Sequence, residues 1–74
     1  MSDKPATLVD CDGVVFVLFS NVFEDIMEED DSLENLRYGL KDDNYDYLYK
    51  AGDLAEAEQW CNENDWTVSE TIYA

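Results

Sequence analysis

The sequence has no histidine, three glycines and only four lysine and arginine residues among 74. Without histidine, neither of the two cysteines has a base that would activate it as a nucleophile. The glycines do not form a phosphate-binding loop. The apolar run over 14–19 is too short to span a membrane and follows no basic leader. We therefore expect a cytoplasmic protein that is not an enzyme and that uses no cofactor, metal or membrane.

Acidic residues are what the chain has in excess. Nineteen Asp and Glu residues against four bases give a formal net charge of −15, and the segment 24–34 contains seven acids and no base. Self-repulsion on this scale opposes a compact state, so we expect the charge to serve attraction toward a strongly cationic surface. The grooves that proteins line with Lys and Arg to hold nucleic acid are abundant surfaces of that kind.

The composition is nevertheless that of a folded protein. Apolar residues make up 46% of the chain and aromatic residues 14%, whereas acidic disordered segments are poor in both. We expect residues 1–74 to form a single acidic α+β domain with a thin core, which partner binding or dimerisation would supplement. Cys11 and Cys61 are expected to be buried, reduced thiols.

A β-hairpin is the clearest local prediction. Asp12-Gly13 lies between two β-prone runs, and type I′ turns favour this pair because both central residues need a positive φ. A two-residue loop pairs Cys11 with Val14 and so fixes the register. One face of the hairpin then carries Val9, Cys11, Val14, Phe16 and Leu18, and the other carries Leu8, Asp10, Val15 and Val17. Because both faces are largely apolar, we expect the hairpin to be covered on both sides or to occupy the centre of the sheet.

Capping residues and periodicity predict the next elements. Apolar residues at helical spacing predict a helix over 22–29, with Asn21 and Glu24 as its capping box. A second short helix is expected to follow Ser32, whose hydroxyl can accept a hydrogen bond from the first turn. Alternating tyrosines then predict a strand over 45–50.

The last part of the chain is predicted to add a helix and a strand. Asp53 and Glu56 form another capping box, followed by an apolar helical stripe. The final strand is expected to place Trp66, Val68 and Ile72 on one face. The predicted order is ββα(α)βαβ, an antiparallel sheet of about four strands with two or three helices in the α+β class.

One short stretch resembles a catalytic motif. Residues 8–15 end a β-prone run with Asp-Cys-Asp-Gly, which resembles the first motif of haloacid-dehalogenase-like phosphatases. On that resemblance, Asp10 would be the nucleophile and Asp12 the general acid. The family also needs a longer parallel α/β domain, a downstream lysine and paired acids that hold magnesium. Because a motif without its structural context is weak evidence, we favour a hairpin turn here.

A second stretch has the spacing of a calcium loop. Asp42, Asn44, Asp46 and Asp53 fall at its positions 1, 3, 5 and 12. The sixth position, which should be glycine for the sharp turn, is Tyr47. We therefore favour a solvated acidic loop that leads into a strand.

The acids of the predicted helix over 22–29 have the spacing of a phosphate backbone. A helix rises about 1.5 Å per residue, so they supply roughly one charge per 2 Å, against one phosphate per about 1.7 Å of duplex DNA. Like charges four residues apart and acids near a helix C-terminus both destabilise the helix, so selection for folding alone would soften the cluster. The candidate partner-binding residues are Glu24, Asp25, Glu28, Glu29, Asp30, Asp31 and Glu34, with Asp42, Asp43 and Asp46 as a second cluster.

In size, charge and compactness, the chain resembles the small acidic inhibitors of bacteriophages and other mobile elements: DNA-mimic anti-restriction proteins, anti-CRISPR proteins and uracil-DNA glycosylase inhibitors. The resemblance implies a non-enzymatic inhibitor that fills the cationic groove of a CRISPR effector, restriction enzyme, nuclease or glycosylase, and that binds no nucleic acid itself. Tyr45 or Tyr47, if exposed, would add anchoring contacts. The alternative is an acidic adaptor or antitoxin-like module that binds a basic protein; a homodimer is also left open.

Overall fold

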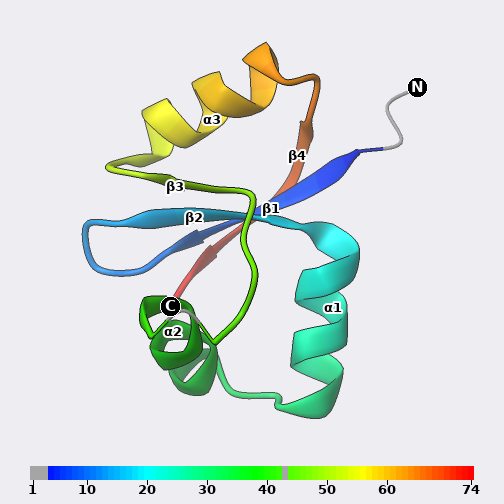
Figure 1. The fold of residues 1–74 in the computed structure, drawn as a ribbon, viewed down its shortest axis with the longest axis vertical. Coiled ribbons are helices and arrows are strands. Elements are labelled where there is room, and N and C mark those ends of the chain that lie inside the picture. The colour runs from blue at the N-terminus through cyan, green and yellow to red at the C-terminus, as the bar shows by residue number, and fades with distance from the viewer. Residues whose placement is uncertain (1–3, 43) are drawn as a thin grey trace.

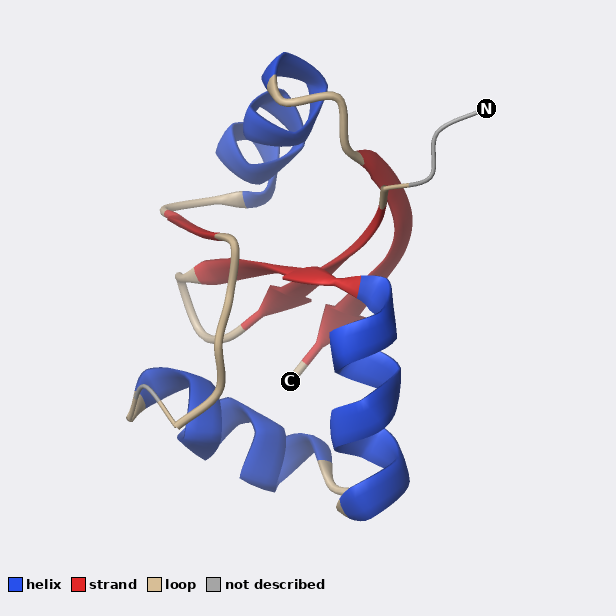
Figure 2. Cartoon of the chain, turned by 45° about the vertical axis from the view of Figure 1, so that its right-hand side comes forward, coloured by secondary structure: helices blue, strands red, loops and turns tan. Residues whose placement is uncertain are grey.

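The computed structural model describes residues 4–42 and 44–74. The strands form one sheet in the order β3-β2-β1-β4, with α1 and α2 on one face and α3 on the other (Figures 1 and 2). This confirms the predicted α+β class and the predicted order of elements. In chain order the elements are β1 (Pro5–Asp10), β2 (Val15–Phe19), α1 (Ser20–Glu29), α2 (Leu33–Lys41), β3 (Tyr49–Ala51), α3 (Leu54–Glu63) and β4 (Thr67–Tyr73).

The β1–β2 hairpin lies at the centre of the sheet and confirms the predicted turn. Asp12 and Gly13 both have positive φ, 54° and 91°, as a type I′ turn requires. Cys11 N–H donates to Val14 O at 2.7 Å, and Val14 N–H donates to Cys11 O at 3.3 Å. The register along the two strands is the predicted one.

Both faces of this hairpin are buried, so the domain has two cores. The first core lies between the sheet and the helices α1 and α2, and its buried members are Val9, Cys11, Phe16, Leu18, Phe23, Ile26, Leu36 and Leu40. The second core lies between the sheet and α3, and its buried members are Ala6, Leu8, Val15, Val17, Ala51, Ala57 and Cys61. One pair of strands therefore contributes to both cores, which is why both of its faces are apolar in the sequence.

Helix α1 begins earlier than predicted. Strand β2 runs into it without a loop, so Phe19 holds the N-cap position and no side chain caps the helix. The capping box predicted for Asn21 and Glu24 is therefore wrong. Ser20 becomes the first helical residue, and it is buried against the sheet.

Hydrogen bonds among three hydroxyl groups connect α1 to the strands β1 and β4. Ser69 Oγ–H donates to Ala6 O at 3.1 Å. Ser20 Oγ lies 2.8 Å from Ser69 Oγ and 2.9 Å from Thr7 Oγ1. Each hydroxyl has a single proton, so Ser20 donates to Ser69 and Thr7 donates to Ser20. The buried hydroxyls are thereby satisfied, and β1, α1 and β4 are joined at one point.

The caps predicted for the other two helices are present. Ser32 Oγ accepts a hydrogen bond from Asn35 N–H at 3.3 Å at the start of α2. Asp53 Oδ1 accepts one from Glu56 N–H at 2.7 Å at the start of α3. In both helices a side-chain oxygen satisfies an amide that has no partner within the helix.

Strand β4 pairs with β1 in parallel, so the sheet is mixed and the prediction of a purely antiparallel sheet is wrong. The physical reason lies in the connection between β3 and β4. The helix α3 covers one face of the sheet between these two edge strands, and a helical crossover of this kind joins parallel strands, whereas a short turn joins antiparallel ones.

A β-bulge in β4 overturns a second prediction. Ala6 lies opposite Val68 and Thr7 lies opposite Glu70, so Ser69 is an extra residue on the β4 side. One extra residue inverts the alternation of side chains beyond it. Val68 therefore packs on the second core and Ile72 on the first, and the two residues do not share the face that we predicted for them together with Trp66.

The strand predicted over 45–50 is also shorter than expected. Tyr45 and Tyr47 belong to a segment that crosses from α2 to the edge of the sheet, and only Tyr49 lies in β3 (Figure 1). The ring of Tyr47 packs edge-on against that of Phe16, with 5.0 Å between centroids, and Tyr45 packs on the first core as well. Backbone pairing with β2 begins only at Leu48, whose N–H donates to a β2 carbonyl at 2.7 Å.

The packing of Tyr45 predicts the effect of one substitution. Gly39, in α2, is buried, and a Cβ added there would collide with the ring of Tyr45. Overpacking of this kind costs about 1–3 kcal/mol, which exceeds the gain of about 1 kcal/mol in helix propensity from alanine. We expect Gly39→Ala to lower the free energy of unfolding by about 1 kcal/mol, measured by urea denaturation with tryptophan fluorescence.

The matched control is Gly52→Ala. There the nearest atom to an added Cβ is Glu56 Oε1 at 3.7 Å, an ordinary contact. We expect a change below about 0.5 kcal/mol. A Gly39→Ala protein as stable as the wild type would contradict the packing described.

Candidate functional site

The acids of α1 lie on its solvent-facing side. Phe23 and Ile26 are buried in the first core and so fix how the helix is turned. The four predicted carboxylates of this helix are all exposed: Glu24, Asp25, Glu28 and Glu29. They form two pairs of like charges spaced four residues apart, and no basic residue lies in the last turn of α1.

The acidic row continues through the turn into α2. Asp30 ends α1 and is half-buried, and its Oδ2 accepts a hydrogen bond from Asn35 Nδ2 at 2.9 Å. Asp31 is exposed in the turn, and Glu34 is exposed in the first turn of α2. The structure therefore places these three acids and the four of α1 on the same side of the sheet, along one helix, its turn and the start of the next.

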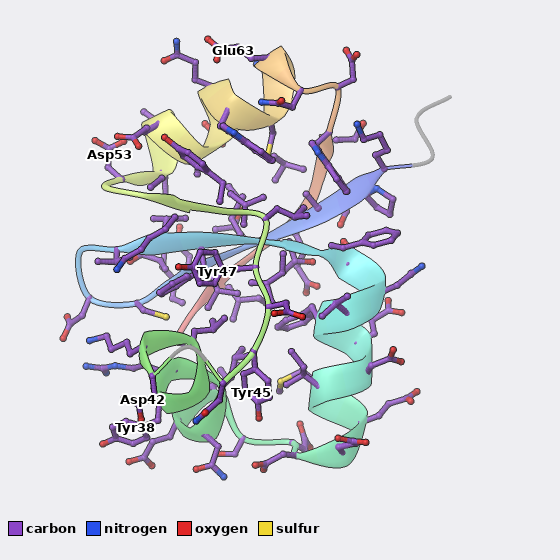
Figure 3. The ribbon with its side chains drawn as sticks, in the orientation of Figure 1. Tyr38, Asp42, Tyr45, Tyr47, Asp53 and Glu63 are labelled. Atoms are coloured by element: carbon purple, nitrogen blue, oxygen red, sulfur yellow. The ribbon has the colours of Figure 1, made fainter. Side chains whose placement is uncertain are left out.

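The second predicted cluster lies at the other end of α2. Asp42 is the C-cap of that helix and is exposed, and Asp46 is exposed in the segment that leads to β3. Asp43 lies outside the described residues. Figure 3 places Asp42 near Tyr38 on the outer side of α2, and Tyr38 is 58% exposed.

Few basic side chains lie on this surface: Lys41 is exposed in the last turn of α2, next to Asp42. Arg37 Nη2 pairs with Asp12 Oδ2 at 3.0 Å, at the tip of the hairpin. Lys50 lies over the ring of Phe16 at 5.9 Å, on the sheet. No hydrogen bond or ion pair among the described residues engages the carboxylates of Glu24, Asp25, Glu28, Glu29, Asp31, Glu34, Asp42 or Asp46.

Sequence reasoning missed a second acidic layer, on α3. Asp53 and Glu56 are part of the fold: Asp53 caps the helix, and Glu56 Oε2 accepts a hydrogen bond from Tyr49 Oη at 3.0 Å. That hydrogen bond raises the pKa of the Tyr49 hydroxyl. Glu58 and Glu63 are exposed. The sequence could have indicated this exposure, because Glu58 and Glu63 lie off the apolar stripe of the predicted helix.

The two alternative motifs take other roles in the structure. Asp10 and Asp12 belong to the end of β1 and to the hairpin turn, and β2 returns antiparallel to β1. The chain between Asp42 and Asp53 includes β3, and Figure 3 shows these two residues at widely separated places on the molecule. They therefore do not surround a common point.

The tyrosines that we singled out as anchors are not the exposed ones. Tyr45 and Tyr47 are half-buried against the first core. Tyr38 on α2 and Tyr73 at the end of β4, 68% exposed, are the tyrosines that face solvent. The alternation of tyrosines in the sequence indicated a pattern of burial but not which tyrosines fill the core.

The charge pattern of α1 predicts a stabilising substitution. Glu28 and Glu29 lie at the C-terminal end of the helix dipole, four residues after other acids. We expect the double variant Glu28→Gln/Glu29→Gln to raise the free energy of unfolding by about 0.5–1 kcal/mol at low ionic strength, with a smaller gain in about 1 M NaCl because salt screens exposed charges. Urea denaturation at both ionic strengths measures it.

Glu34→Gln provides a control of opposite sign. Glu34 lies in the first turn of α2, where a negative charge is favourable, so its removal should destabilise by a few tenths of a kcal/mol, roughly. A double variant of α1 that is less stable than the wild type would show that these acids support the fold.

The burial of the two thiols predicts that they react slowly in the folded protein. Cys11 and Cys61 are free, buried, and members of different cores on opposite faces of the sheet. Burial raises the pKa of both thiols, so neither is a thiolate near neutral pH. We expect both thiols to react with a disulfide reagent only in denaturant. The absorbance of the released thiol measures the reaction. Rapid modification of either thiol in the folded protein would contradict this placement.

No protein-family model, curated protein or solved structure matches this chain. In the described part of the chain, no group of three or more Cys, Asp or Glu side chains is placed to hold a metal ion. None of the helices described is both long and apolar enough to cross a membrane.

Proposed function

We propose that the protein is a non-enzymatic inhibitor that acts in the cytoplasm of a bacterial cell. Its exposed carboxylates on α1, the following turn and α2 occupy the cationic groove in which a defence or DNA-processing protein holds nucleic acid. The inhibitor itself binds no nucleic acid, since its charge has the same sign as that of the phosphates.

The observation that carries the proposal is a row of unpaired carboxylates on two anchored helices. The acids of α1 point to solvent because Phe23 and Ile26 are buried beneath them. Helix α2 is held in the same way by Leu36 and Leu40. Charges fixed on a folded scaffold lose little conformational freedom on binding, so more of the electrostatic attraction remains as affinity.

The organisation of α2 supports the same surface. Glu34, Tyr38 and Asp42 recur every four residues and are all exposed, which places them along one stripe. Of the two bases of α2, Arg37 is paired with Asp12 at the hairpin tip, and Lys41 is exposed in the last turn. Tyr38 would stack on an arginine of the groove, as exposed aromatic rings do in protein interfaces.

The acids of α3 are weaker candidates. Asp53 and Glu56 already hold the helix start and the Tyr49 hydroxyl. Glu63 accepts a hydrogen bond from Gln59 at 3.2 Å. Three carboxylates of this layer therefore already have partners within the fold, whereas among the described residues of the α1–α2 layer only that of Asp30 does.

The first experiment is affinity capture on the immobilised protein from bacterial lysate, with and without competing duplex DNA. We expect a nucleic-acid-binding protein or ribonucleoprotein complex to be retained at low salt and released at high salt, because salt screens the attraction between the carboxylates and the Lys and Arg side chains of the target. We also expect duplex DNA to release the target, because its phosphates compete with the carboxylates for those side chains. Capture that DNA does not affect would favour the acidic adaptor or antitoxin-like alternative.

Two matched variants then test the surface. Glu24→Gln/Glu28→Gln removes two charges from α1, and Glu58→Gln/Glu63→Gln removes two from α3. For the captured protein at low salt, we expect the α1 variant to bind about tenfold more weakly and the α3 variant to bind within about twofold of the wild type. Isothermal titration calorimetry measures both, and equal effects of the two variants would refute the assignment to α1.

A further inference from the structure

Strand β4 leaves one edge of the sheet open. Among the described strands it pairs only with β1, so it is an edge strand. Its backbone directions follow from the bonds at its two ends. Thr67 N–H donates to Lys4 O at 2.9 Å, and Ala74 N–H donates to Asp10 O at 3.0 Å. Because amides alternate along a strand, those of Thr71 and Tyr73 face away from β1.

The two edges of the sheet are protected to different degrees. Strand β3 has three residues with Lys50 at its centre, and a short strand with a lysine is a common way to blunt an edge. Strand β4 has seven residues without Lys or Pro. Its bulge at Ser69 disturbs only the N-terminal half, so Glu70–Tyr73 remains regular and free to pair.

This edge also carries little of the chain's acidic charge. The segment from Trp66 to Ala74 contains a single acid, Glu70, although the chain has nineteen. A cationic strand would therefore find little to attract it here. The exposed side chain at the end of the edge is Tyr73, 68% exposed, beside the half-buried Ile72. The edge suits an uncharged, β-prone strand.

We propose that the occupant is a second copy of this chain, with the two β4 strands paired antiparallel about a two-fold axis. Such an interface uses the same patch on both subunits and needs no other partner. The register that pairs Thr71 with Tyr73 of the partner subunit satisfies the outward amides. It also sets Ile72 opposite Ile72 of the partner subunit and keeps the two Glu70 side chains apart.

The pairing makes an eight-stranded sheet and a weak dimer. A ladder this short covers less than the roughly 800 Å² per partner of a stable complex, and the net charge of −15 on each copy opposes association. We expect dimers at concentrations on the order of 100 µM, stabilised by salt. Salt would weaken the capture of a cationic target, so the two associations respond to salt in opposite directions.

The test is the molar mass by sedimentation equilibrium as a function of concentration and salt. We expect the mass to rise from 8.5 kDa toward twice that value, and to do so at lower concentration in about 1 M NaCl. Thr71→Pro removes an outward amide without touching the bonds to β1 and should stay monomeric. Thr71→Ala keeps the amide and should dimerise like the wild type.

A second variant and a second measurement locate the interface. Tyr73→Glu places a charge at the edge on a side chain that is already exposed, and it should also prevent dimerisation. Amide exchange by NMR should slow at Thr71 and Tyr73 as concentration rises. A wild type that stays monomeric at about 1 mM in high salt, or a dimer in which these amides do not slow, would overturn the proposal. Capture of the target by Thr71→Pro is expected to persist, so this proposal and the proposed inhibition fail independently.

Discussion

The fold depends on a hairpin that is apolar on both faces. Strands β1 and β2 cannot leave either face in water, because each carries fully buried side chains such as Leu8 on one face and Phe16 on the other. Helices α1 and α2 therefore cover one face of the hairpin, and α3 covers the other. A domain of 74 residues thereby has two small cores that share one pair of strands, and the three helices that cover them carry acidic residues on their outer sides.

Local chemistry made the hairpin and two of the caps predictable. The two-residue turn at Asp12-Gly13 needs positive φ at both residues, which this pair tolerates. Ser32 and Asp53 accept hydrogen bonds from amides three residues further along the chain. Neighbouring residues alone therefore decide these features. The mixed sheet was not predictable in this way. Whether β4 joins β1 in parallel or antiparallel depends on where α3 crosses the sheet, which is a long-range property that no local pattern encodes.

The bulge at Ser69 shows a second limit. Its extra residue inverts the side-chain alternation of β4. Ser69 also hydrogen-bonds to Ser20 and to Ala6 O, and these partners are distant from it in sequence. For the candidate site, helical spacing correctly placed the acids of α1 at exposed positions. It could not show that Tyr45 and Tyr47 fill the first core, because that depends on the path of the chain from α2 to the sheet.

The exposed acids of α1 are arranged in a way that destabilises the folded protein. Those of α1 repeat at the spacing where like charges repel, and they end at the negative pole of the helix dipole. The buried hairpin and its two cores provide the stability that makes such a surface tolerable. The proposed inhibition requires this separation between an apolar interior that holds the helices and exposed acids on α1 that do not stabilise the fold.

Competition for one groove is the central claim, and fluorescence anisotropy of labelled duplex DNA bound to the captured target tests it most directly. If the acidic surface replaces the phosphates, the apparent dissociation constant for DNA rises linearly with the concentration of this protein, without reaching a limit. An apparent constant that reaches a plateau or does not change, while this protein is bound to the same target, would contradict the account.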